Sequence, residues 1–158
     1  MSQTEVTEIR CVLIPLASSR LLLPNAVVAE VMDFQAPVPR DGMPEWYLGD
    51  LVWRGTSVPL VSLEGMLGGS VAVPGRRSRT LVLNTLNGNQ ELTHIALIAQ
   101  ALPTLVRVTL DNLEPSKVRS DLGALISQSV SVNNSLSLIP DLDALERRVL
   151  ETLVPAAG

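Results

Sequence analysis

The chain of 158 residues is 46% hydrophobic and 18% charged, which favours one folded domain with a sizeable core over a disordered polypeptide. Its net charge of -4 lacks the basic character that general nucleic-acid binding requires. Cys11 is the only cysteine and His94 the only histidine, so the sequence excludes an intramolecular disulfide and every zinc site that needs several Cys or His ligands.

The sequence shows neither a secretory signal nor a membrane-spanning segment. The first ten residues are polar and include Glu5 and Glu8, unlike the basic start and apolar run of a secretory signal. No stretch approaches about 20 consecutive apolar residues. We therefore expect a cytoplasmic protein of a reducing compartment, without direct insertion into a membrane.

Short runs of apolar and β-branched residues, separated by turn residues, favour an all-β barrel or sandwich. We expect strands at residues 12–16, 20–23, 48–53, 58–63, 81–83, 92–98 and 105–110. Residues 54–57 should join the third and fourth of these strands. Pro59, inside the fourth, predicts an edge strand or a bulge because proline has no backbone N–H to donate.

Glycines and prolines mark the predicted connections. Residues 37–44 and 69–79 are expected loops. A short helical turn over residues 64–67 should end at Gly68, because glycine accepts the left-handed conformation that closes a helix. The pair Asn87-Gly88 is the strongest hairpin signal in the sequence and should connect two of the expected strands.

A second hairpin is predicted near the C-terminus. A three-residue loop at 133–135 would pair Val132 with Leu136 and Val130 with Leu138, which places all four apolar side chains on one face. A two-residue loop would place them on opposite faces, because a one-residue slip reverses every side chain. We therefore expect the three-residue loop, with the serines on the solvent side.

The last predicted element is an amphipathic helix. Asp141 can cap its first turn, and Asp143 precedes Arg147 by four residues, the favourable order for an exposed ion pair. Its buried stripe should consist of apolar residues spaced three or four apart: Leu142, Leu145, Val149 and Leu153. A faint likeness between residues 58–67 and 136–145, each a strand followed by a helical turn, suggests two similar small barrels.

Local patterns do not indicate a catalytic site. His94 lies in a predicted strand without a neighbour to orient it as a general base, and Cys11 opens an apolar run where a thiol behaves as a small hydrophobe. Arg76, Arg77 and Arg79 form a basic loop cluster that could bind an anionic ligand. Aromatic residues do not interleave with this cluster, so a solvated face is the simpler interpretation.

The most specific stretch lies at residues 48–63. Gly49 is followed after four residues by Arg54-Gly55, after three more by Pro59, and then by apolar residues. This pattern resembles the central signature of the CheW-like domain of bacterial chemosensory coupling proteins.

Two further segments are similar to the same family. Residues 28–31, Val-Ala-Glu-Val, look like its Val-x-Glu-Ile/Val strand, and residues 95–108 look like its second-half strand pair. The resemblance extends over residues 10–153. It implies a mostly β fold of two small, five-stranded, SH3-like β-barrels that share a core, with a C-terminal helix. It also implies one domain at residues 10–154, between a flexible N-terminus, 1–9, and a tail, 155–158.

Family members are non-catalytic adaptors that link the cytoplasmic tip of a chemoreceptor to the regulatory domain of a histidine kinase. By motif match, Glu30 and Arg54 would be paired charges near the receptor-facing groove, and Val28 would line it. Gly49 and Gly55 would lie at the strand start and the turn of the same surface. A structural ion pair within the sheet is the alternative role of Glu30 and Arg54.

The sequence departs from the family pattern at Ser62, where Asp is common, and at Trp53, where Leu is common. Residues 11–30 are similar to accessory CheW-like proteins of twitching-motility chemosensory systems. The sequence leaves open whether Trp46, Tyr47 and Trp53 are core or contact residues.

Three hypotheses follow. The first is a chemosensory adaptor without a cofactor or metal, recruited from the cytoplasm to membrane-associated receptor arrays. The second is a small β-barrel module that binds a ligand or nucleic acid through Arg76, Arg77 and Arg79, and the third is an enzyme with residues drawn from distant parts of the chain.

Overall fold

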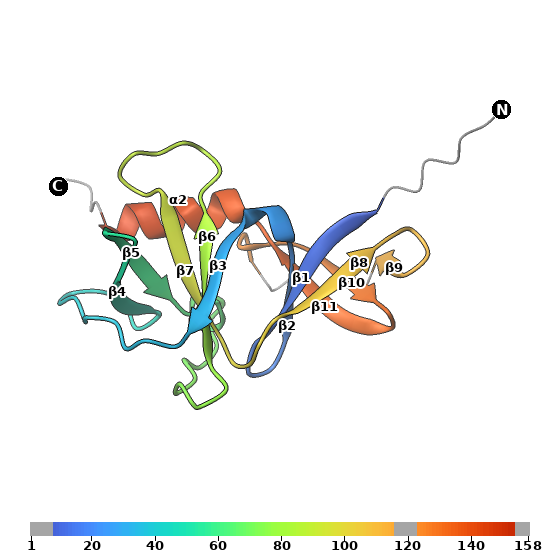
Figure 1. The fold of residues 1–158 in the computed structure, drawn as a ribbon, viewed down its shortest axis with the longest axis horizontal. Coiled ribbons are helices and arrows are strands. Elements are labelled where there is room, and N and C mark those ends of the chain that lie inside the picture. Colours follow the sequence, from blue (N-terminus) through green and yellow to red (C-terminus); the bar gives the residue numbers. More distant parts are fainter. Residues whose placement is uncertain (1–7, 116–122, 154–158) are drawn as a thin grey trace.

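The computed structural model describes residues 8–115 and 123–153, which form two β-sheets and a C-terminal helix (Figure 1). The expected N-terminal segment 1–9 and tail 155–158 lie outside these residues, apart from Glu8 and Ile9.

The elements are as follows. The first sheet contains, in spatial order, β3 (Val28–Asp33), β6 (Arg79–Asn84), β7 (His94–Ala99), β5 (Thr56–Val61) and β4 (Tyr47–Trp53). The second contains β8 (Thr104–Val108), β1 (Ile9–Pro15), β2 (Arg20–Pro24), β11 (Ser135–Pro140), β10 (Ile126–Val132) and β9 (Leu113–Pro115). The helical elements are η1 (Asn25–Val27), α1 (Leu63–Met66) and α2 (Leu142–Leu153). Every strand predicted from hydrophobic patterning overlaps one of these strands.

Both sheets repeat one pattern of strand pairing. Two antiparallel pairings are followed by a parallel pairing and an antiparallel hairpin, as β3-β6-β7-β5-β4 and as β8-β1-β2-β11-β10. A capped helix follows each hairpin: Ser62 Oγ accepts from the Gly65 N–H at 3.2 Å, and Asp141 Oδ1 accepts from the Ala144 N–H at 3.0 Å. The predicted likeness of the two halves is confirmed, and the fold is the expected mostly β architecture of two SH3-like barrels. The three-residue strand β9 makes the second sheet six-stranded, one strand more than expected.

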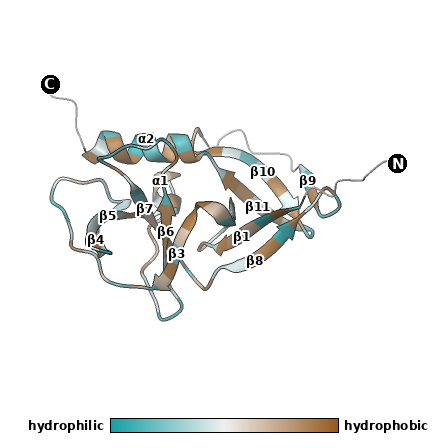
Figure 2. Ribbon diagram, turned by 45° about the horizontal axis from the view of Figure 1, so that its top comes forward, coloured by the Kyte–Doolittle hydropathy of each residue, from teal (hydrophilic) through white to brown (hydrophobic). Residues whose placement is uncertain are grey.

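Three apolar clusters fill the molecule. One lies inside the first barrel, around Trp53 and Leu60, and one lies inside the second barrel, around Leu22 and Val130. The third and largest lies between the barrels, where β1 and β2 of one meet β6 and β7 of the other beneath α2. Figure 2 shows hydrophilic and hydrophobic residues alternating along α2, as expected for a helix with one buried stripe. The two halves are therefore joined by a shared core.

Pro59 does not lie in an edge strand, contrary to one of the two predicted readings. Its strand β5 is interior, between β7 and β4. The parallel pairing with β7 involves only Leu60 and Val61, so the ladder starts one residue beyond the proline. A register shift in the β4–β5 ladder does occur nearby, between Tyr47 and Gly49. The absence of a backbone N–H at Pro59 is therefore tolerated because β5 pairs with β7 only beyond the proline, and not because β5 is an edge strand.

The connection between β4 and β5 has two residues, not the four expected. Trp53 pairs with Thr56, and Arg54 and Gly55 both have positive φ, of 49° and 76°. Two successive residues with positive φ form the turn whose twist matches a β-hairpin. Thr56 and Ser57 consequently belong to β5.

The predicted register of the last hairpin is wrong. Val132 pairs with Ser135 and Ser129 pairs with Leu138, which leaves a two-residue loop of Asn133 and Asn134 with φ of 50° and 66°. The predicted register requires that only one face of the hairpin is buried. Here both faces are buried: Val130 and Val132 fill the second barrel, whereas Leu138 packs into the core between the barrels. Ser129 and Ser137 are accordingly buried at 3% and 1% exposure instead of lining the solvent side.

The helix α2 begins after Asp141 as predicted, but its acidic residues have other partners than expected. Asp143 does not pair with Arg147 within the described residues; its Oδ1 accepts from Asn87 Nδ2 at 2.9 Å. Glu146, only 5% exposed, accepts from the Leu86 N–H and from Asn87 Nδ2, both at 3.0 Å. The predicted hairpin around Asn87-Gly88 forms, but its connection runs from 85 to 93 and is held by the helix.

Candidate functional site

The structure brings Glu30 and Arg54 together at the seam of the first barrel. Arg54 Nη2 lies 3.1 Å from Glu30 Oε1, although the two residues belong to opposite ends of the sheet. Glu30 is in β3, and Arg54 follows the end of β4. The ion pair therefore joins the two end strands of the sheet across the closure of the barrel.

Trp53 supports both members of this pair. Its indole Nε1–H donates to the same Glu30 Oε1 at 3.3 Å, and the Arg54 guanidinium carbon lies 4.6 Å from the centre of the indole ring. The His94 ring lies 4.6 Å from the same indole, centroid to centroid. Because Trp53 is only 8% exposed and packs in the barrel core, its side chain is a rigid base for two exposed charges.

The pair itself faces solvent. The Arg54 side chain is 69% exposed and the Glu30 side chain 38%. An ion pair with this exposure contributes about 0–1 kcal/mol to folding, because solvent screens it and two long side chains must be ordered. Most donor positions of the guanidinium remain available to a neighbouring molecule.

Gly49 and Gly55 have structural reasons to be glycine. Gly49 has a φ of 144°, and a Cβ there would lie 2.5 Å from the carbonyl oxygen of Val38. This close approach lets Val38 and Asp50 exchange two backbone hydrogen bonds of 2.9 Å. Gly55 completes the tight turn that presents Arg54, and nothing lies within 4 Å of where its Cβ would be. Val28, at the start of β3, is half-buried against the core between the barrels.

A family model, the CheW-like domain, matches residues 10–149 of this chain. The chain belongs to the CheW-like domain family. In three dimensions it is similar to the scaffolding protein TtCheW from Thermoanaerobacter tengcongensis, with a TM-score of 0.73 and 18% sequence identity over 90% of each chain. That likeness shows a shared fold. A search of curated proteins gave no match. CheW-like proteins are scaffolds of chemosensory signalling, and this chain has their domain over most of its length.

A second cluster in this CheW-like chain was not predicted from the sequence. The Tyr47 hydroxyl donates to Asp50 Oδ1, and Arg40 Nε lies 3.2 Å from Asp50 Oδ2. Burial, with the Asp50 carboxylate adding to it, raises the pKa of Tyr47 well above its ordinary value. The cluster fastens residues 37–44, a predicted loop, to β4. The residues were visible in the sequence, but nothing in their spacing indicated that the loop folds back onto the strand.

The aromatic residues are largely core residues. Tyr47 is 6% exposed and Trp46 packs at the edge of the core between the barrels. Trp53 packs in the core of the first barrel and also contacts Glu30 and Arg54 of the candidate site.

The basic loop cluster is only partly available to a ligand. Arg79 Nη1 donates to the backbone carbonyls of Arg76, Arg77 and Ser78, and Arg79 Nε lies 3.7 Å from Asp33 Oδ1. Arg79 is thus used to close its own loop. Arg76 and Arg77 are exposed. Two exposed arginines make a weaker anion site than the three predicted.

Cys11 is buried in the second barrel, and burial raises the pKa of its thiol. Among residues 8–115 and 123–153, three or more His, Cys, Asp or Glu side chains do not gather into a group that could hold a metal ion. In the same part of the chain, none of the helices is long and apolar enough to cross a membrane.

Proposed function

We propose that this chain is a non-catalytic adaptor that couples a chemoreceptor to a histidine kinase through its Glu30–Arg54 surface. The observation that carries the proposal is an exposed ion pair, held on the buried Trp53 ring, in a domain of the CheW-like family. We define the Glu30–Arg54 surface as Glu30 and Arg54, with Gly55 completing the turn that presents Arg54. The proposal extends it to Val28, in the strand of Glu30, and to Gly49, in the strand that leads to Arg54.

The backbone of Arg54 favours a contact role over a purely structural one. Its φ of 49° lies in the left-handed region, which costs a residue with a Cβ about 1–2 kcal/mol. The exposed ion pair contributes about 0–1 kcal/mol and the contact of the guanidinium with the Trp53 ring about 0.5–1 kcal/mol, so together they do little more than offset that cost. Glycine or asparagine would form the same turn with less strain. An arginine held in a strained position at a surface turn fits a residue that serves binding.

The setting of this activity is part of the proposal. The adaptor would work on the cytoplasmic side of membrane-associated receptor arrays. The similarity of residues 11–30 to accessory proteins of twitching-motility systems supports a place in such a system.

Removing the arginine tests the proposal. We expect Arg54→Ala to weaken binding to a purified chemoreceptor signalling domain, or to the regulatory domain of the cognate kinase, at least about tenfold, because aromatic-supported arginines anchor interfaces. The melting temperature should change little, since the guanidinium is exposed. Isothermal titration calorimetry measures both affinities, and Arg76→Ala is the matched control on another loop. A large loss of stability with unchanged affinities would identify a structural ion pair instead.

A further inference from the structure

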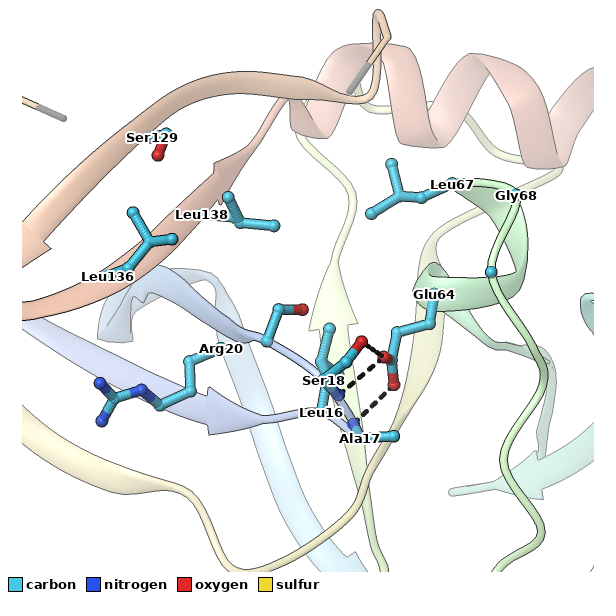
Figure 3. Close-up of a pocket in the computed structure, with 12 residues that line it drawn as sticks. Leu16, Ala17, Ser18, Arg20, Glu64, Leu67, Gly68, Ser129, Leu136 and Leu138 are labelled. Atoms are coloured by element: carbon cyan, nitrogen blue, oxygen red, sulfur yellow. Dashed lines mark hydrogen bonds between the residues drawn. The ribbon is translucent and has the colours of Figure 1, made fainter. Parts of the chain in front are cut away.

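A groove of about 920 Å³ lies where the two barrels meet, away from the Glu30–Arg54 surface. It is built by the turn between β1 and β2, by α1 with the two glycines that follow it, and by β10 and β11. Figure 3 shows Leu136 and Leu138 on one side of it, Leu67 and Glu64 on the other, and the β1–β2 turn between them. The groove therefore uses elements of both barrels and none of the residues of the Glu30–Arg54 surface.

Four leucines contribute to the walls of the groove: Leu16, Leu67, Leu136 and Leu138. Leu16 and Leu138 are buried, with exposures of 8% and 6%, whereas Leu136 at the rim is 57% exposed. Its neighbour across the strand pair, Ser131, faces the same way. Leu136 therefore extends the apolar wall of Leu138 to the rim of the groove, where apolar side chains of a partner can cover it. Gly68 and Gly69 line the opposite wall, so a partner backbone can approach there closely.

The charges in the groove are unevenly satisfied. The Glu64 carboxylate accepts three hydrogen bonds, from the Ala17 N–H at 2.7 Å, the Ser18 N–H at 3.1 Å and the Ser18 hydroxyl at 2.9 Å. Arg20 makes neither an ion pair nor a side-chain hydrogen bond with the residues that the structure describes. Of the two charged groups that line the groove, the Glu64 carboxylate is thus bonded by neutral protein donors, whereas the Arg20 guanidinium is left to bind a carboxylate from outside.

Hydrogen bonds also join the two walls of the groove in the absence of a partner. Glu64 belongs to α1 of the first barrel, whereas Ala17 and Ser18 lie in the β1–β2 turn of the second. Three hydrogen bonds to one carboxylate hold these two walls in place. A preformed groove loses less conformational entropy on binding than a flexible one.

We propose that this groove is a second docking surface, which takes an apolar segment of a protein partner that carries an acidic side chain. Apolar side chains of the segment pack against Leu136 and Leu67, and its carboxylate pairs with Arg20. The inference rests on the proposed adaptor function, because a protein that couples two others must contact both at once through different residues. The groove and the Glu30–Arg54 surface satisfy that requirement.

Two variants test the groove directly: Leu136→Asp, which places a charge on the apolar rim, and Arg20→Glu, which reverses the free charge. Leu110→Asp and Arg76→Glu are matched controls, since Leu110 is 87% exposed and neither residue lines the groove. The probes are a purified chemoreceptor signalling domain and the purified regulatory domain of the cognate histidine kinase, titrated separately by calorimetry. Melting temperatures of all variants establish that they are folded.

We expect both groove variants to weaken one of the two probes at least about tenfold and the other less than twofold. Arg20→Lys should retain most of the affinity, because it keeps the charge. Arg54→Ala should show the opposite selectivity. If folded groove variants leave both affinities unchanged while Arg54→Ala still acts, the second docking surface is wrong and the adaptor function stands.

Two other results would overturn the inference. Loss of the same single probe by the groove variants and by Arg54→Ala would place both surfaces in one interface. Stabilisation of the wild type by dodecanoate that Arg20→Glu abolishes, with both protein affinities unchanged, would assign the groove to a small amphiphile. If the wild type binds neither probe, the adaptor function fails and the inference fails with it.

Discussion

At the scale of single residues, the Glu30–Arg54 surface depends on one buried ring and one tight turn. The Trp53 indole N–H donates to Glu30, and the face of the ring contacts the Arg54 guanidinium. The rest of the side chain packs in the barrel core. The family resemblance indicated that Glu30 and Arg54 would be close. It gave no reason to expect Trp53 between them, because Leu is common at that position in the family and cannot donate a hydrogen bond.

Gly49 allows the sharpest stability prediction. Gly49→Ala should destabilise the protein by about 2–4 kcal/mol, because the new Cβ meets the Val38 carbonyl and the φ of 144° is strained for alanine. Gly55→Ala is the matched control and should cost about 1 kcal/mol, since only the left-handed φ of 76° opposes it. Urea unfolding of both variants measures the difference. Equal losses would mean that the contact with Val38 does not constrain this strand.

The raised pKa of Tyr47 leads to a prediction of how protein stability depends on pH in the alkaline range. It is the only tyrosine, so absorbance reports its ionisation without overlap from other tyrosines. The native state binds the phenol proton more tightly than the unfolded chain, because burial and Asp50 raise the pKa of Tyr47 in the fold. Its contribution to stability is therefore complete below the ordinary pKa near 10 and is lost as the pH rises above it.

The expected result is that the folded protein shows little tyrosinate absorbance at about pH 10.5, whereas the urea-unfolded protein is largely ionised. Asp50→Asn removes the adjacent carboxylate and should shift the folded titration toward lower pH. Coincident titrations of the folded and unfolded states would contradict the burial of this hydroxyl.

At the scale of elements, the least predictable features are those in which a residue serves two sheets. The strand positions followed from apolar runs, and Asp141 was a correct helix cap. The predicted register of the β10–β11 hairpin is wrong because Val130 and Val132 lie on one buried face and Leu138 on the other. Strands between two cores present apolar side chains on both faces, so the alternation of apolar residues alone does not determine the register of their pairing.

The link from α2 to the β6–β7 connection was equally hidden. The sequence does not distinguish Glu146 from the other polar residues of the helix, and its partners Leu86 and Asn87 lie about 60 positions earlier in the chain. A buried carboxylate that accepts a backbone N–H is recognisable only when the structure shows what surrounds it.

Glu146→Ala tests this link. We expect a loss of about 1–3 kcal/mol, because the Leu86 N–H and the Asn87 amide lose a buried acceptor. Asp143→Ala removes a neighbouring, exposed acceptor of Asn87 on the same helix and should cost no more than about 0.5 kcal/mol. Thermal unfolding followed by circular dichroism compares the two variants. Similar small effects would show that α2 is held by its leucines alone.

At the scale of the whole molecule, two barrels of the same strand order share a core and carry two separate surfaces. The Glu30–Arg54 surface belongs to the first barrel alone, whereas the groove needs both. The small barrels, their repeat and the C-terminal helix could be predicted from patterning and from the family signature. The groove could not, because its residues come from separate parts of the chain that only the packing of the barrels brings together.

The central claim is that Glu30 and Arg54 face a partner and are not merely a brace between β3 and β4. The most direct measurement exchanges the two charges, as Glu30→Arg with Arg54→Glu, and compares this double variant with Arg54→Ala in calorimetric titrations. The exchange keeps two opposite charges at the seam but reverses the pattern that a partner meets. We predict that binding to the chemoreceptor or kinase domain stays at least about tenfold weaker than in the wild type, with the fold intact. Recovery of wild-type affinity by the exchanged pair would contradict the claim and make the ion pair structural.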